Sequence, residues 1–147
     1  MSTVDVSRDG EIATLTLNNP GKLNAVNLGM WLRLAENIAV LSVDRDIRCI
    51  VLRGAGDEAF AAGGDLEEFV TARATLEQAL HYHGHVAAAL NAIADCPHPT
   101  VALIQGACIG GGMEIAGACD LRICGESARF GAPINRLDFS MYPGEME

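Results

Sequence analysis

Two glycine-rich turns constrain the fold of this chain more than any other feature. Their sequences are FAAGGDL at residues 60–66 and GACIGGGME at residues 106–114. Each is predicted to follow a strand and to open a helix, where the first backbone N–H groups have no partner inside the helix. Two such N–H groups aimed at one point form an oxyanion hole. Because Glu114 places a carboxylate beside the second turn, the pattern predicts an enzyme that stabilises an enolate and moves a proton.

Size and charge narrow the possible functions. The 147 residues, half of them hydrophobic, suffice for one packed domain, which we assign to residues 1–147. The formal net charge of −9 argues against nucleic acid as a partner, since binding to nucleic acid depends on neutralising phosphates. The same charge argues against an anionic membrane surface, so no membrane partner is expected either.

The cysteines favour a reducing compartment. Their number is odd and none forms a CxxC pair, so we interpret them as buried, reduced thiols and expect a cytoplasmic protein. They are Cys49, Cys96, Cys108, Cys119 and Cys124.

The first half of the chain alternates strands and helices. Val4–Arg8 and Ile12–Leu17 are predicted to form a hairpin through Asp9-Gly10. Asn27 is predicted to cap a helix with an apolar stripe, and a short buried strand follows at Cys49–Arg53. The stripe consists of Trp31, Leu34, Ile38 and Leu41.

The second half continues the alternation after a loop at 54–64. Asp65 with Glu68, and Thr75 with Gln78, are each predicted to form a capping box at the start of a helix. The second of these helices carries one apolar face, and a strand, the second glycine turn and a helix follow it. The apolar face comprises Ala79, Tyr82, Val86, Ala89 and Ile93, and the later strands are Thr100–Gln105, Leu121–Cys124 and Ala128–Phe130.

Alternating strands and helices imply right-handed crossovers and a mainly parallel α/β sheet. Several short motifs, taken in this order and spacing, identify a more specific resemblance. The chain resembles the enoyl-CoA hydratase/isomerase (crotonase) family. The matching segments are NPGKLNAV at 19–26, AGGD at 62–65, IGGGME at 109–114, Cys119-Asp120 and FGAP at 130–133. The resemblance implies a crotonase-like ββα spiral core.

The resemblance also implies how the glycine turns act. The backbone N–H groups of Gly64 and Gly111 would form the oxyanion hole that holds a thioester oxygen, although the glycines would also suit simple tight turns. The substrate would be a coenzyme A thioester, with no cofactor. Lys22, which would lie near the CoA phosphates, can equally be an ordinary loop lysine. The implied substrate and CoA contacts are Lys22, Ala62, Gly64, Asp65, Leu66 and Gly111.

Glu114 matches the family's catalytic acid/base, while its alternative is a solvated residue favoured by the helix dipole. The family's hydratases carry a second glutamate where this chain has Ile134. Isoleucine can neither hold water nor deliver a proton, whereas moving a double bond needs only one base. The sequence therefore favours isomerisation over hydration, with Asp138 and Glu145 as nearby carboxylates that could substitute.

Other chemistries are disfavoured. His81 and His85 share a helix face without a carboxylate at good spacing, so no metal site is expected. The triplet Gly110–Gly112 lacks the spacing of a dinucleotide-binding loop. A peptidase on the related Clp-type spiral would need a serine on a glycine turn, where this chain has Gly64 and Gly111.

The resemblance ends near Tyr142–Gly144. We therefore expect residues 1–147 to lack the family's C-terminal helical region. In the family, that region closes the acyl pocket and builds the trimer interface. A full-length version is expected to be a homo-oligomer, a trimer or a dimer of trimers. The lead function is acyl-CoA binding with thioester-enolate chemistry, and the alternative is a non-catalytic acyl-CoA-binding pseudoenzyme or an inactive fragment.

Overall fold

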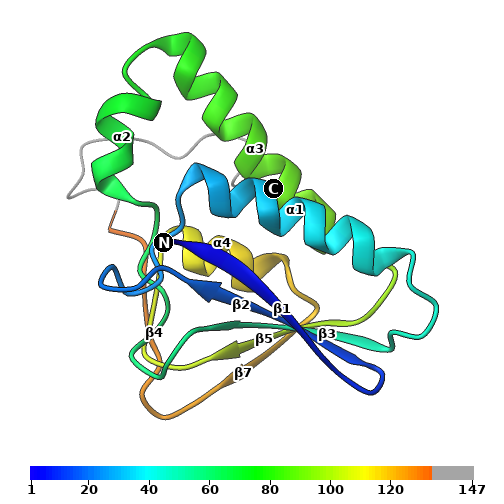
Figure 1. Ribbon diagram of the computed structural model, residues 1–147. Coiled ribbons are helices and arrows are strands. Elements are labelled where there is room, and N and C mark those ends of the chain that lie inside the picture. The colour runs from blue at the N-terminus through cyan, green and yellow to red at the C-terminus, as the bar shows by residue number, and fades with distance from the viewer. Residues whose placement is uncertain (134–147) are drawn as a thin grey trace.

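The computed structural model describes residues 1–133, which form two sheets with helices packed on one side (Figure 1). The first sheet has five strands in the order β1-β2-β3-β5-β7, and the second has three in the order β4-β6-β8. The elements are β1 (Thr3–Asp9), β2 (Ile12–Asn18), α1 (Leu28–Ser42), β3 (Cys49–Gly54), β4 (Ala59–Ala61), α2 (Leu66–Ala72), α3 (Leu76–Ala94), β5 (Thr100–Ile104), β6 (Ala107–Ile109), α4 (Gly111–Ala118), β7 (Leu121–Cys124) and β8 (Arg129–Gly131).

The first two strands form the predicted hairpin. They pair antiparallel along their whole length, and Gly10 takes a positive φ of 58° in the turn between them. Strand β2 then pairs with β3 in parallel. Alternate residues of β2 point into the core, because successive side chains of a strand face opposite sides of the sheet. These buried residues are Ala13, Leu15 and Leu17.

The rest of the described chain repeats one unit. A strand of the large sheet leads to a short strand of the small sheet and then to helix, as in β3–β4–α2–α3 and β5–β6–α4. Strands β3, β5 and β7 pair in parallel, and so do β4, β6 and β8. The expected mainly parallel α/β sheet and ββα spiral are therefore confirmed. Strands β4 and β6, however, lie in segments predicted to be loop or turn, because a strand of three residues is too short to give a periodic pattern.

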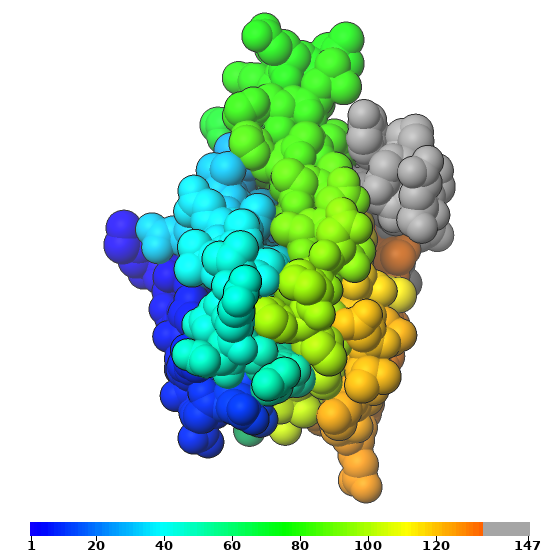
Figure 2. All heavy atoms as spheres, turned by 90° about the vertical axis from the view of Figure 1, so that its right-hand side faces the viewer, coloured from blue at the N-terminus to red at the C-terminus, as the bar shows by residue number. Residues whose placement is uncertain are grey.

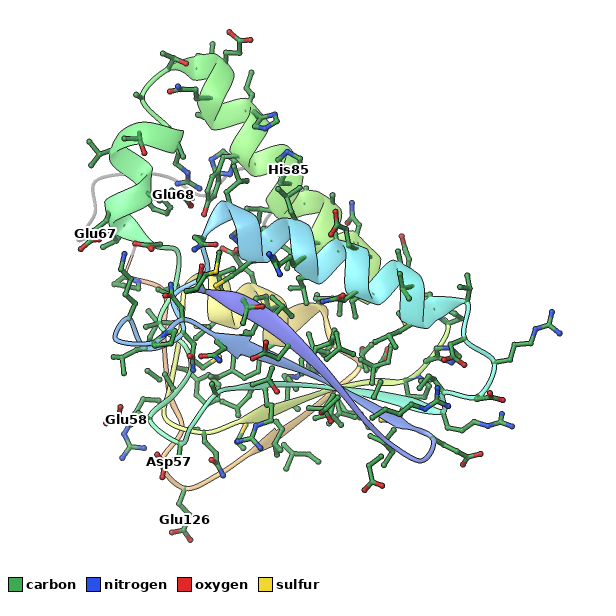
Figure 3. All side chains as sticks on the ribbon, in the orientation of Figure 1. Asp57, Glu58, Glu67, Glu68, His85 and Glu126 are labelled. Atoms are coloured by element: carbon green, nitrogen blue, oxygen red, sulfur yellow. The ribbon has the colours of Figure 1, made fainter. Side chains whose placement is uncertain are left out.

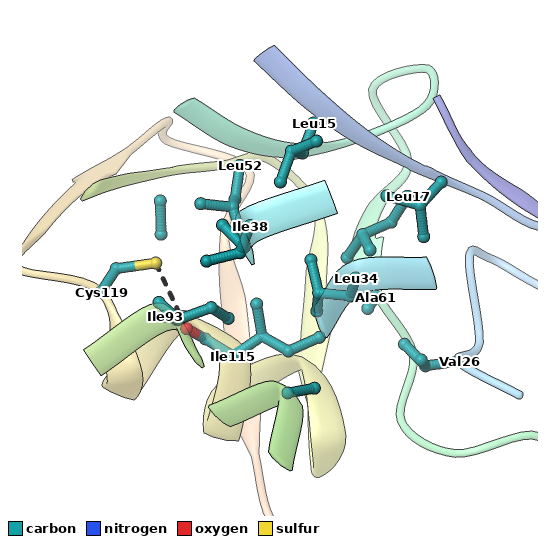
Figure 4. Close-up of a cluster of buried hydrophobic side chains, with 14 of the residues drawn as sticks. Leu15, Leu17, Val26, Leu34, Ile38, Leu52, Ala61, Ile93, Ile115 and Cys119 are labelled. Atoms are coloured by element: carbon teal, nitrogen blue, oxygen red, sulfur yellow. Dashed lines mark hydrogen bonds between the residues drawn. The ribbon is translucent and has the colours of Figure 1, made fainter. Parts of the chain in front are cut away.

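The helices bury their predicted apolar faces in one core on this side of the large sheet. Helix α1 contacts β1 and β2 and lies side by side with α3 (Figure 2), which also contacts α4, and α4 in turn contacts β4, β5 and β6. Figure 4 shows the core that results, where side chains from strands and helices interdigitate and the Cys119 thiol donates to the Ile115 carbonyl at 3.3 Å. Of the five cysteines, Cys108 and Cys119 are buried, but Cys124 is exposed, which corrects the prediction that all are buried.

Helix caps follow the sequence with one exception. Asn27 caps α1 by accepting from the N–H of Met30 at 2.9 Å, and Thr75 with Gln78 forms the predicted capping box of α3. Asp65 caps α2, but the predicted box with Glu68 is wrong. The Glu68 carboxylate instead accepts from the N–H of Leu28 at 2.7 Å and ties α2 to the start of α1 (Figure 3).

Asp120 holds the starts of β5 and β7 together. Its Oδ2 accepts from the N–H of Thr100 at 2.8 Å and from the Thr100 hydroxyl at 3.0 Å, and that hydroxyl accepts from the N–H of Asp120. The backbone N–H and then the hydroxyl of Thr100 lower the pKa of the Asp120 carboxyl. Within residues 1–133, no helix is long and apolar enough to cross a membrane.

We predict that Gly112→Ala destabilises the fold, because the new Cβ would lie 2.4 Å from the carbonyl oxygen of Ala61 in β4. We expect a loss of about 2–3 kcal/mol in the free energy of unfolding, measured with denaturant. Gly117→Ala in the same helix is the control. Its Cβ meets no atom within 4 Å, so a gain of up to about 1 kcal/mol is expected. Equal effects at both positions would contradict this account of α4 packing.

We also predict that Asp120 makes stability sensitive to acid. Since its folded pKa lies below the ordinary value of 3.8, its contribution is present above that value and is lost as pH falls through the folded pKa. Between about pH 6 and about pH 3, the melting temperature of Asp120→Asn should therefore fall less than that of the parent. If the melting temperatures of Asp120→Asn and the parent fall by the same amount across this range, the Thr100 contacts are not linked to protonation of Asp120.

Candidate active site

Pairing between the short strands brings the two glycine turns together. Strands β4 and β6 are parallel neighbours in which Ala61 lies opposite Cys108, so the turns leave the same end of the small sheet. The contact is close, because a Cβ on Gly110 would lie 3.7 Å from Cα of Gly63. Segments that are distant in the sequence therefore share one site.

Each turn contains a glycine in a conformation that side chains disfavour. Gly63 has φ of 98°, and Gly110 has φ of 48°. Only glycine adopts such positive values readily. Each is followed directly by a predicted oxyanion donor, Gly64 or Gly111, so the positive φ of this glycine sets the direction of the next N–H group.

Both predicted donors have unoccupied N–H groups within the described part of the chain. The N–H of Val26 donates to the Gly63 carbonyl at 2.8 Å, and the N–H of Asp65 donates to the Val26 carbonyl at 3.1 Å. This bridge leaves the N–H of Gly64 pointing away from Val26. Gly111 is the first residue of α4, where an N–H has no partner inside the helix. Neither N–H has a hydrogen-bond partner among residues 1–133.

Glu114 lies in the first turn of α4 and is half-buried. Its own N–H donates to the Gly110 carbonyl at 3.0 Å, which fixes the main chain of residue 114 one helical turn from Gly111. The negative charge of Glu114 also acts on the Tyr82 hydroxyl of α3. A carboxyl group at this place can exchange a proton with a ligand whose oxygen lies at the two glycine N–H groups.

Lys22 is already paired with carboxylates. Its Nζ lies 2.8 Å from Oδ2 of Asp65 and 2.8 Å from Oε2 of Glu67, the exposed residue labelled on α2 in Figure 3. Hydrogen bonding to Asp65 first, and to Glu67 second, raises the pKa of Lys22. A phosphate group approaching Lys22 would therefore compete with two carboxylates. Asp65, predicted to contact the substrate, uses its carboxylate to cap α2 and to bind Lys22.

The loop at 19–26 holds the first glycine turn in place. The N–H of Ala62 donates to the Leu23 carbonyl at 3.0 Å, and Leu66 is half exposed beyond it. Asn24, with a positive φ of 57°, donates from Nδ2 to the carbonyls of Ala55 and Ala59. A hollow of about 390 Å³ lies between this loop and residues 55–59, with Glu58 in its lining. Hydrogen bonds thus hold the loop that carries Lys22 against the turn that carries Ala62, Gly64 and Asp65.

Two aromatic side chains border the donors, and the sequence analysis did not place them there. A Cβ on Gly111 would lie 3.1 Å from Cζ2 of Trp31, and one on Gly64 would lie 2.6 Å from Cζ of Phe69. Trp31 was predicted only as part of an apolar stripe. The sequence signal that could have placed them was an aromatic residue on a helix next to a glycine turn, as with Phe69 after Gly64.

The other residues considered in the sequence analysis are two histidines of α3 and three residues beyond position 133. The His81 and His85 rings meet edge-to-face on α3 with their Nε2 atoms 3.1 Å apart, and no group of three or more His, Cys, Asp or Glu residues within 1–133 could hold a metal. Ile134, Asp138 and Glu145 lie outside the described residues.

Comparisons with known proteins agree with this geometry. Residues 7–145 match the sequence profile described as enoyl-CoA hydratase/isomerase. The chain is 30% identical over 133 residues to a short-chain-enoyl-CoA hydratase of Clostridium acetobutylicum, covering 90% of this chain and 50% of the relative. It is 33% identical over 132 residues to a peroxisomal Δ(3,5)-Δ(2,4)-dienoyl-CoA isomerase of Arabidopsis thaliana, covering 83% and 47%.

A solved structure has the same fold as this chain. The crystal structure of an enoyl-CoA hydratase/carnithine racemase from Magnetospirillum magneticum superposes with a TM-score of 0.96 at 46% identity. The match covers 99% of this chain and 55% of that one. The chain spans about half the length of the curated relatives it matches.

Proposed function

Because the chain belongs to the enoyl-CoA hydratase/isomerase family, we propose that it binds an acyl-CoA thioester with the thioester oxygen at the N–H groups of Gly64 and Gly111. The observation that carries the proposal is the pairing of β4 with β6. It places two N–H groups, both without partners among residues 1–133, on adjoining glycine turns.

The chemistry that such a pair favours is charge stabilisation. A thioester oxygen gains negative charge when the neighbouring α-carbon loses a proton. Two preset donors stabilise that enolate, and the loss of one such donor typically lowers rates by about 10²–10³-fold. Since Gly64 and Gly111 carry no side chains, a ligand can approach both N–H groups closely.

We assign the proton transfer to Glu114. As a carboxylate it removes a proton from the α-carbon, and the electron pair moves onto the thioester oxygen as the enolate. As a carboxylic acid it returns the proton to carbon. Its place one turn from Gly111, in the first turn of α4, supports this role.

Within this chemistry we favour movement of a double bond. One carboxyl group can remove a proton at the α-carbon and return it at the γ-carbon, so a second carboxylate is unnecessary. Ile134, at the position of the second hydratase glutamate in the family resemblance, supports this choice. The relatives include both a hydratase and a dienoyl-CoA isomerase, so either branch is compatible with the family.

The second candidate is a protein that binds acyl-CoA without catalysis. Ile134 favours it as well, because the residue removes one carboxylate of the hydratase pair. A homo-oligomer and a cytoplasmic location stay predictions. The exposed apolar side chains of β7 and β8 provide surface for an oligomer contact. These are Leu121, Ile123 and Phe130.

We predict that Gly111→Pro weakens acyl-CoA binding about tenfold or more, because proline lacks the N–H group that would hold the thioester oxygen. Proline is tolerated at the first position of a helix, so α4 should still form. Gly111→Ala is the matched control, since it adds the same Cβ beside Trp31 but keeps the N–H. Calorimetric titration with a saturated acyl-CoA measures both. Equal affinities in the two variants would exclude Gly111 as a donor.

We predict that Glu114→Gln lowers the exchange of α-protons between bound acyl-CoA and deuterated water by about 10²-fold or more. Glu77→Gln is the matched control, because Glu77 occupies the first turn of α3. NMR of the recovered acyl-CoA measures the exchange. Unchanged exchange in Glu114→Gln would remove the residue from the mechanism. No exchange in the parent would favour the non-catalytic alternative, and rapid hydration of crotonyl-CoA would contradict the preference for isomerisation.

A further inference from the structure

Two buried polar atoms near the glycine turns lack hydrogen-bond partners among residues 1–133. They are Nε1 of Trp31 on α1 and the hydroxyl oxygen of Tyr82 on α3. Trp31 is 2% exposed and Tyr82 is 1% exposed. Folded proteins rarely leave such groups unsatisfied, because a buried donor loses its hydrogen bonds to water. A core position that needed only apolar packing would be filled as well by phenylalanine.

Both side chains adjoin the candidate active site. The indole atom Cζ2, two bonds from Nε1, lies 3.1 Å from the place where a Cβ on Gly111 would be. The Tyr82 ring packs edge-on against Phe69, with ring centroids 5.7 Å apart. Phe69 in turn contacts Gly64. The unpartnered atoms are thus connected to both candidate oxyanion donors by direct contacts.

The surrounding groups favour an acceptor as the missing partner. An indole N–H can only donate, and burial raises the pKa of the Tyr82 hydroxyl to about 12, so this group also keeps its proton. The Trp31 N–H and the positive charge of Arg73 oppose that rise, while Glu68 and Glu114 add to it. A weak hydrogen-bond interaction from the Trp31 N–H lowers the pKa of the Tyr82 hydroxyl, but it falls short of full hydrogen-bond geometry, so both groups can still donate to an acceptor on a ligand.

Arg73 adds positive charge at the same place. Its guanidinium carbon lies 4.0 Å from the centroid of the Phe69 ring and 4.4 Å from that of Tyr82. A plain alkyl chain beside these groups would leave two donors unsatisfied next to a cation. An oxygen atom would accept hydrogen bonds from both.

From this cluster we propose, resting on the acyl-CoA function above, that the acyl group of the substrate carries an oxygen of its own. This oxygen, in a hydroxyl, oxo or carboxylate group, accepts hydrogen bonds from Trp31 and Tyr82. The two residues therefore determine which acyl group is bound, while the glycine turns bind the thioester.

Calorimetric titration of the purified protein with five ligands tests the proposal. They are coenzyme A, hexanoyl-CoA, 3-hydroxyhexanoyl-CoA, 5-oxohexanoyl-CoA and glutaryl-CoA. At least one oxygenated thioester should bind about tenfold more tightly than hexanoyl-CoA, as one or two buried hydrogen bonds would give. The preferred thioester identifies the position and charge of the oxygen.

Two variants then locate the effect. In Trp31→Phe and in Tyr82→Phe, the ratio of the affinity for the preferred oxygenated thioester to the affinity for hexanoyl-CoA should fall toward one. The melting temperature of Tyr82→Phe should be unchanged or higher, because the variant removes a hydroxyl that has no partner among residues 1–133. A lower melting temperature with the preference retained would show that the hydroxyl serves the fold, and would overturn the proposal.

The outcomes separate this inference from the function on which it rests. If hexanoyl-CoA binds more tightly than coenzyme A but no oxygenated thioester is preferred, only the present inference is wrong. If no thioester binds more tightly than coenzyme A, the proposed function and this inference both fail.

Discussion

The parallel pairing of β4 with β6 is the contact on which the candidate site depends. It sets the glycine turns of successive ββα units side by side, at the distance of two packed backbones. Helix α4 can then begin against β4 only because Gly112 has no side chain there. Shifting this pairing by one residue would reverse the facing of the short strands and separate Gly64 from Gly111. A three-residue strand thus controls the geometry of two donors and of Glu114.

Much of the fold could be predicted because its signals are local. The cap at Asn27 and the box at Thr75 each depend on residues within one helical turn, and both are confirmed. The buried stripe from Trp31 to Leu41 follows from helical spacing. The family resemblance supplied the spiral arrangement, which the solved structure from Magnetospirillum magneticum shares.

What the sequence could not predict depends on distant contacts. Glu68 satisfies the local rule for a capping box, yet the N–H of Leu28 is the partner that the fold provides. Strands β4 and β6 are too short for a period and exist because each pairs with a neighbour in the next unit. Tyr82 was correctly predicted to be buried, but burial alone does not show that its hydroxyl lacks a partner among residues 1–133. The roles of Gly64, Gly111 and Glu114 stay predictions.

The candidate donors are backbone N–H groups of glycines, and this has a consequence for evolution. A side chain at Gly111 would press on Trp31, and one at Gly112 would overlap β4, so substitution there disturbs the scaffold before it can alter selectivity. Substitutions that change ligand preference are therefore expected on α1, α2 and α3. Side chains of these helices border the turns, but the turns are formed by the glycine main chain. Under the proposed function, the main chain of the turns would then carry the chemistry, and the side chains that border them would carry the selectivity.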